Sequence, residues 1–190
     1  MKPQARLLTL ALALALGAAS CSRRETVEYI RVKPVKGIIE ITFEAPKSWA
    51  RSLSQTGKAD SSWAVELSHP ENRFATIGIQ KFTTDPKRTG FPVLTAEAFL
   101  ERLKQLPKTT VGPEEPRKTP HLSLRSFPYE GDYIQVSGGA GKAPHMKGID
   151  ACFEAGGFLY TVSYAVPAED FAIYLPIFEH LLETLELSPA

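Results

Sequence analysis

The stretch GIDACFEAGGFLYTVSYAV, residues 148–166, decides the fold of this chain. It consists of two apolar runs, 148–154 and 158–166, separated by Gly156 and Gly157. Two glycines between two such runs are a strong signal for a β-hairpin, because glycine adopts the positive φ angles that tight turns require. The sequence therefore predicts a pair of antiparallel strands near the C-terminal end.

Further strands are predicted upstream of this hairpin. Apolar and polar residues alternate over 39–43, which is typical of a half-buried strand, and Pro46 ends it. Similar patterns predict strands over 63–67, 75–82, 121–127 and 132–137, the last two joined by a turn at 128–131.

A helix is predicted between the third and fourth strands. Thr95 is a natural N-cap, an apolar stripe of Phe99, Leu103 and Leu106 follows, and Pro107 stops the helix. Residues 107–120 contain four prolines and predict a long exposed loop within one domain.

A second helix is predicted to begin at 167–170, where acidic residues suit the positive end of the helix dipole. Pro176 is expected to kink this helix or to restart it after a short first turn. The order of the elements predicts an α+β fold. We expect an α/β/α sandwich in which helices cover a twisted antiparallel sheet of about six to seven strands.

The end of the chain resembles that of PsbP-like and DcrB-like domains. In those families a Tyr/Thr-rich strand, here 158–167, precedes a helix with an aromatic-x-x-aromatic-x-Pro pattern. The matching helix positions are Phe171, Tyr174, Pro176 and Phe178, and an apolar finish follows at 182–187.

The start of the folded region resembles the same families, with a strand that ends at Phe43–Pro46 and is followed by Trp49. The resemblance spans residues 37–187. It implies an α/β/α sandwich and a role in assisting or binding other proteins.

The first 21 residues, MKPQARLLTLALALALGAASC, predict export. Lys2 and Arg6 precede an uncharged run, 7–19, which is shorter than the roughly 20 residues that span a bilayer. A removable signal peptide over 1–20 therefore fits better than a permanent anchor. Residues 21–36 are interpreted as a short tether with room for an early strand, and 37–190 as the globular domain.

Cys21 is the predicted lipidation site. The residues before it resemble a bacterial lipobox at Ala19 and Ser20, whereas Ala18 stands where Leu is usual. The resemblance implies a diacylglycerol on Cys21, which anchors the protein to a membrane. Ser22 then favours the outer membrane, facing the periplasm, if the cell is Gram-negative. Ordinary secretion of a soluble periplasmic or extracellular protein is the alternative.

Composition and motifs exclude several functions. The chain has 22 basic and 21 acidic residues, and loss of Lys2 and Arg6 leaves 20 − 21 = −1, so nucleic acid is not an expected partner. Cys152, the other cysteine, is predicted to be a buried thiol. The four histidines lack zinc-site spacing, and 137–143 lacks the glycine and hydroxyl of a phosphate-binding loop. We expect no metal and no cofactor.

The sequence thus favours a non-enzymatic lipoprotein of the cell envelope. It would act as an accessory module that contacts an envelope protein while Cys21 holds it at the membrane. The alternative is a small-ligand or lipid-binding domain with a pocket between sheet and helices, and a hydrolase built from dispersed residues ranks third. Trp49 has two interpretations: a core residue, which is favoured, or an aromatic anchor at the rim of a binding groove.

Overall fold

The computed structural model describes residues 26–34, 40–55, 63–83, 95–132 and 144–188. The predicted signal peptide, Cys21 and all but the first residue of the predicted strand 132–137 lie outside these ranges. The strands are β1 (Tyr29–Val32), β2 (Ile41–Pro46), β3 (Ala50–Gln55), β4 (Trp63–Ser68), β5 (Thr76–Thr83), β6 (Thr109–Val111), β7 (Glu115–Lys118), β8 (Ser123–Gly131), β9 (Met146–Ala155), β10 (Phe158–Pro167) and β11 (Glu186–Leu187). The helices are α2 (Ala96–Lys104) and α3 (Phe171–Thr184), the latter preceded by a 3₁₀ turn at Ala168–Asp170.

The predicted hairpin forms the middle of a large antiparallel sheet. Its strand order is β3-β4-β5-β10-β9-β8-β6, and β7 also pairs with β8. Strands β9 and β10 pair along their whole lengths, from Phe158 opposite Ala155 to Pro167 opposite Met146. Gly156 and Gly157 have φ angles of 60° and 79°, so the hairpin prediction is confirmed.

A second, smaller sheet has the order β1-β2-β11. Strand β1 pairs with β2 from Tyr29 opposite Pro46 to Val32 opposite Phe43. The early strand considered for the tether is thus present, and it is part of the folded unit rather than a free spacer.

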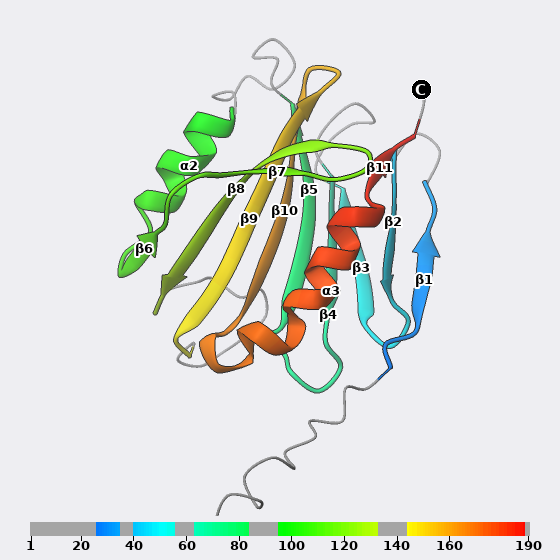
Figure 1. Ribbon diagram of the computed structural model, residues 1–190, viewed down its shortest axis with the longest axis horizontal. Coiled ribbons are helices and arrows are strands. Elements are labelled where there is room, and N and C mark those ends of the chain that lie inside the picture. Colours follow the sequence, from blue (N-terminus) through cyan, green and yellow to red (C-terminus); the bar gives the residue numbers. More distant parts are fainter. Residues whose placement is uncertain (1–25, 35–39, 56–62, 84–94, 133–143, 189–190) are drawn as a thin grey trace, which may run out of the picture.

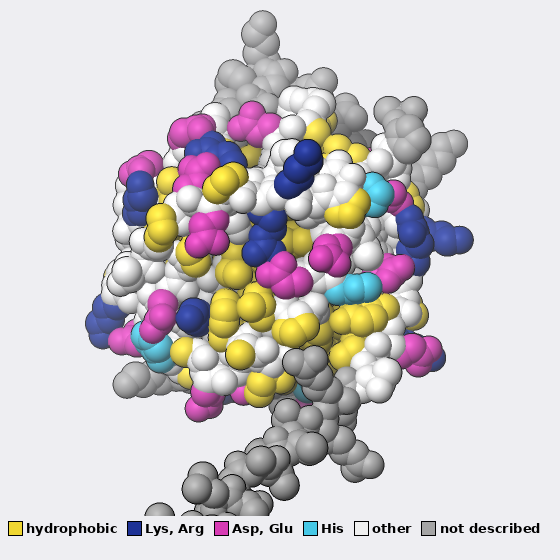
Figure 2. Space-filling model, in the orientation of Figure 1, with side chains coloured by type: hydrophobic (Ala, Val, Ile, Leu, Met, Phe, Trp, Pro, Cys, Tyr) yellow, Lys and Arg dark blue, Asp and Glu magenta, His cyan; other side chains and the backbone are white. Residues whose placement is uncertain are grey.

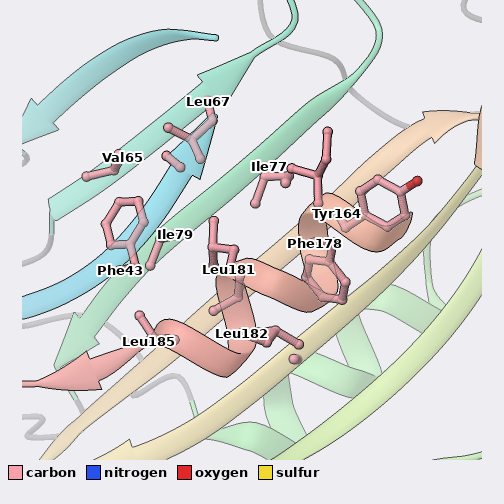
Figure 3. Packing of buried hydrophobic residues seen from close by; sticks show 14 of the residues in the cluster. Phe43, Val65, Leu67, Ile77, Ile79, Tyr164, Phe178, Leu181, Leu182 and Leu185 are labelled. Atoms are coloured by element: carbon pink, nitrogen blue, oxygen red, sulfur yellow. The ribbon is translucent and has the colours of Figure 1, made fainter. Parts of the chain in front are cut away.

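One face of the large sheet is covered by α3 and the small sheet, as Figure 1 shows. The helix contributes Phe178, Leu181 and Leu182, and β2 contributes Phe43, all of them at most 1% exposed. They pack on β4, β5 and β10, where Val65, Leu67, Ile77, Ile79 and Tyr164 lie (Figure 3). These side chains alternate along each strand, as a half-buried sheet requires.

The opposite face carries α2. Leu103 of the helix packs in one cluster with Phe127, Cys152 and Leu159 of the sheet. Thr95 caps the helix as predicted, since its side chain accepts a hydrogen bond from the backbone N–H of Ala98. The predicted α+β class, with helices packed on an antiparallel sheet, is confirmed.

The turn predicted at 128–131 is wrong, because β8 continues through Pro128 to Gly131. The carbonyl of Pro128 accepts from the N–H of Gly112, so its own nitrogen also points toward the β6–β7 side. Gly112 lies between β6 and β7, where the regular pairing with β8 is interrupted. The absence of an N–H on Pro128 therefore costs little there.

The loop predicted over 107–120 is wrong in part, because β6 and β7 lie within it. Pro116 belongs to β7, which pairs only with β8 and leaves its other edge open among the described residues, where proline is tolerated. The sheet also has more strands than predicted. Strand β3 was not predicted, because its described side chains, residues 50–54, are all exposed and show no alternation.

The terminal helix forms as predicted after Pro167. Its short first turn is the 3₁₀ turn Ala168–Asp170, and α3 then runs through Pro176 as one element. The restart considered at Pro176 therefore occurs earlier in the chain, before Phe171.

Candidate functional site

Trp49 lies in the turn between β2 and β3 and is only 4% exposed. Its ring meets the rings of His69 and Tyr174 edge to face, with centroids 5.7 and 5.9 Å away. This position agrees with the core interpretation, and a role for Trp49 in binding stays a prediction.

His69 and His145 have structural partners. Nδ1 of His69 accepts hydrogen bonds from the backbone N–H groups of Glu71 and Asn72, at 3.1 and 3.0 Å. His145 lies between two carboxylates, with Nε2 2.8 Å from Glu130 and Nδ1 2.7 Å from Asp132. These hydrogen bonds raise its pKa.

His145 and its two carboxylates do not converge on one point, because the carboxylates occupy opposite nitrogens of the ring. Over the described ranges no group of three or more His, Cys, Asp or Glu side chains is arranged to hold a metal ion.

Cys152 lies in β9 beneath α2 and is fully buried, so the prediction of a core thiol is confirmed. Burial raises the pKa of this thiol to about 11. A nucleophilic cysteine needs the opposite shift, because the thiolate is the reactive form.

The interface between α3 and the large sheet is filled by side chains. Tyr164, Phe178 and Leu181 are all fully buried, and the rings of Tyr164 and Phe178 stack with centroids 5.2 Å apart. The Tyr164 hydroxyl donates to the carbonyl of Phe171 at 2.6 Å. This packing counts against a ligand pocket between α3 and the sheet.

A network of polar groups closes the end of this core near Glu40. The carboxylate of Glu40 accepts from the Tyr160 hydroxyl at 2.5 Å and from Trp63 Nε1 at 3.2 Å, and it pairs with Lys81. Burial raises the pKa of Glu40, but the bonds from Lys81, Tyr160 and Trp63 outweigh it, and the net shift is downward. Both carboxylate oxygens are thus engaged, which favours a structural role.

The outer side of α3 is different, because its first half is apolar. Ala172, Ile173 and Pro176 are exposed there, and Ile173 is 65% exposed. Leu175 and Tyr174 are half-buried beside them. We call these five residues the α3 patch, and Figure 2 shows hydrophobic side chains gathered on the surface where α3 begins.

The second half of α3 has a polar outer side. Glu179 pairs with Arg117 of β7, and Nε2 of His180 lies 2.8 Å from Glu44 of β2. The ring of Tyr29 lies over His180, with centroids 3.9 Å apart. The apolar surface is therefore confined to the first half of the helix.

Proline adds a second feature to the α3 patch. Pro176 has no N–H, so the carbonyl of Ala172 has no donor four residues along the helix. Sequence reasoning missed this surface, although the run FAIYLPIF offered a signal, because it is apolar on every side of a helix.

A buried carboxyl group was also missed. Asp150 lies in the middle of β9, is 5% exposed, and its Oδ1 has no hydrogen-bond partner. Burial raises its pKa to about 7, against the opposing effect of a hydrogen bond from Ser163. The available signal was an acidic residue at an inward position of an apolar strand.

Comparison with known proteins gives a likeness of fold. No protein-family model and no curated protein matches the sequence. No helix among the described residues is long and apolar enough to cross a membrane.

Among solved structures, the cyanobacterial PsbP protein CyanoP from Synechocystis matches with a TM-score of 0.55 and 13% identity, over 90% of this chain and 98% of that one.

LpqN, which is involved in cell envelope biogenesis of Mycobacterium tuberculosis, matches with a TM-score of 0.50 and 14% identity, over 88% of this chain and 94% of that one. A putative regulator from Pseudomonas aeruginosa gives a TM-score of 0.49 at 12% identity, over 86% of this chain and 99% of that one. At such identities the likeness concerns the fold alone. The chain has the fold of PsbP-like proteins.

Proposed function

We propose that this protein is an accessory module of the cell envelope that is anchored by a lipid on Cys21 and binds another envelope protein through the α3 patch. The exposed apolar side chain of Ile173, flanked by Ala172 and Pro176, carries the proposal. Contiguous exposed apolar surface, rimmed by polar residues, is typical of a protein-contact site.

The place where the N-terminal chain joins the folded domain supports an anchor at Cys21 combined with docking at the α3 patch. Tyr29 lies against His180, and Ile173 precedes His180 by seven residues, which is about 10 Å along the same side of the helix. Thr26 follows Cys21 by five positions, a span of at most about 18 Å. An anchor at Cys21 would therefore hold the α3 patch close to the membrane, within reach of a membrane-bound partner.

The comparisons are compatible with the proposal, since LpqN is involved in cell envelope biogenesis. The described surroundings of the patch have carboxylates at Glu169 and Glu183 and a cation at Lys147, whose ammonium group lies 4.7 Å from the centre of the Phe171 ring. The partner surface is therefore expected to be apolar at its centre, with charges of both signs at its rim.

The anchor is tested by Cys21→Ala in the producing cell. We expect the wild-type protein in the membrane fraction and the variant in the soluble periplasmic or extracellular fraction. A variant that stays with the membrane would show that Cys21 is not the anchor.

The α3 patch is tested by Ile173→Asp. Aspartate suits the first turn of a helix, so the free energy of unfolding should change by less than about 0.5 kcal/mol. Formaldehyde crosslinking of intact cells should lose the adduct that contains this protein. Leu53→Asp on β3 is the matched control and should keep the adduct, because it replaces another exposed large apolar side chain of the described residues by the same carboxylate. Equal adduct yields from both variants would contradict docking through this patch.

A further inference from the structure

One row of side chains crosses the large sheet on the face opposite α3. Consecutive pairs along it are directly opposed in the strand register. From β3 to β8 the row consists of Ser52, Glu66, Gly78, Ser163, Asp150 and Phe127. Neighbouring strands are about 4.8 Å apart, so the row brings hydroxyl and carboxyl groups from different strands together.

Burial increases along the row toward α2. Ser52 is exposed, Gly78 and Ser163 are half-buried, and Asp150 is 5% exposed. No described atom lies within 4 Å of a Cβ atom built on Gly78. Among the described residues the row is therefore open in its middle, and Asp150 lies at its closed end.

Two buried polar atoms at this closed end have no partner. They are Oδ1 of Asp150 and Oγ1 of Thr161, and Thr161 is only 1% exposed. Thr161 precedes Ser163 by two residues on β10, so it points to the same face as Asp150 and is its diagonal neighbour. Such orphaned groups are rare in folded proteins, because a buried polar atom loses its hydrogen bonds to water without gaining others.

We propose that the Asp150, Ser163 and Thr161 side chains form a binding site for the ammonium group of a small primary amine, which enters over Gly78. An ammonium group has three N–H donors and a positive charge. Asp150 Oδ1, Thr161 Oγ1 and the hydroxyl oxygen of Ser163 provide three acceptors. This inference is independent of docking at the α3 patch, which lies on the other face of the sheet.

The charges around the site favour an organic cation. Glu66 stands in the same row, whereas Arg125, opposite Cys152 on β8, is held by Glu97 of α2 and by Glu114. A metal ion fits less well, because Glu66 and Asp150 are three strand spacings apart, about 14 Å between backbones.

Ionisation of Asp150 sets the pH dependence of this site. Its pKa is raised to about 7 by burial. The titratable groups that interact with Asp150 are Tyr129 on β8 and Cys152 on β9, and Glu66 of β4 stands in the same row. The ionised carboxylate binds the cation, so affinity should increase about tenfold from pH 6 to pH 8.

The test is a titration of the purified full-length protein in detergent with butylammonium chloride, followed by NMR shifts or calorimetry. We expect saturable binding that strengthens with pH, and no binding of tetramethylammonium, which has no N–H donor. Asp150→Asn and Thr161→Val should each weaken binding at least tenfold, whereas Glu154→Gln, an exposed carboxylate of the same strand, should change it less than twofold.

Unfolding curves of each variant separate loss of binding from loss of fold. Equal affinity in Asp150→Asn, or no saturable binding of butylammonium by the folded wild-type protein, would overturn the proposal. Neither result bears on the α3 patch.

Discussion

The ring of Tyr129 lies directly over Gly148. A Cβ atom on residue 148 would fall 2.5 Å from the phenolic oxygen of Tyr129 and even closer to the carbonyl oxygen of Tyr164. The Tyr129 hydroxyl donates to that same carbonyl, at 3.3 Å. Glycine at 148 therefore lets the aromatic side chain lie flat across β9.

Gly148→Ala should accordingly destabilise the protein by about 2–3 kcal/mol, because the clash involves backbone and a buried ring. Urea unfolding measures the change. Gly78→Ala is the matched control: its Cβ meets no described atom, and alanine should add up to about 1 kcal/mol of stability. Equal effects of the two substitutions would show that the packing of Tyr129 is not as described.

Asp150 should make stability depend on pH. Its folded-state pKa of about 7 is higher than the value of 3.8 for the free side chain, so the folded protein holds the proton more tightly. Proton binding by Asp150 therefore contributes to the free energy of unfolding, by about 4 kcal/mol at most. This contribution is complete below about pH 4, decreases as the pH rises to 7, and is lost above it.

Asp150→Asn should remove this dependence. The free energy of unfolding, measured in urea at pH 5, 6, 7 and 8, should decrease more steeply with pH for the wild type than for the variant. Parallel profiles would show that Asp150 is not a buried proton-binding group.

Cys152 should be inert in the folded protein. The Cys21→Ala chain, which has no other cysteine, should react with a thiol reagent much more slowly in buffer than in denaturing urea, because the thiol is buried and its pKa is raised to about 11. Rapid labelling in buffer would contradict the position of β9 beneath α2.

The Glu40 network should contribute to stability. Tyr160→Phe removes the hydroxyl that donates to Glu40 at 2.5 Å and should cost about 1.5–3 kcal/mol, as expected for a bond to a charged group. Tyr174→Phe is the control on α3 and should cost less, since that ring is half-buried. Thermal or urea unfolding distinguishes the two, and a neutral Tyr160→Phe would show that Glu40 is satisfied without it.

The sequence predicted the elements correctly where the local residue pattern agrees with the burial of the side chains. Gly156 and Gly157, the cap at Thr95 and the alternation of β4 and β5 each predicted an element correctly, because local geometry and the apolar core demand the same residues there. Prediction failed where pairing with other strands, rather than the local residue pattern, determines whether a strand forms. Pro128 continues a strand only because its missing N–H lies opposite the interruption between β6 and β7, and exposed β3 has no alternation to detect.

The candidate sites were harder to predict, since both depend on which surface the fold leaves uncovered. Ile173 and Leu181 are both apolar positions of α3, yet one is 65% exposed and the other fully buried. Asp150 is one of many carboxylates in the sequence, and only the register of β9 with β10 places it beside Ser163.

A photoreactive amino acid at position 173, in living cells, tests whether the α3 patch docks an envelope protein. We expect a discrete adduct with one membrane-associated protein, which is absent when the same residue is placed at exposed position 101 of α2. Adducts of equal yield and identity from both positions, or none from position 173, would contradict docking through the α3 patch.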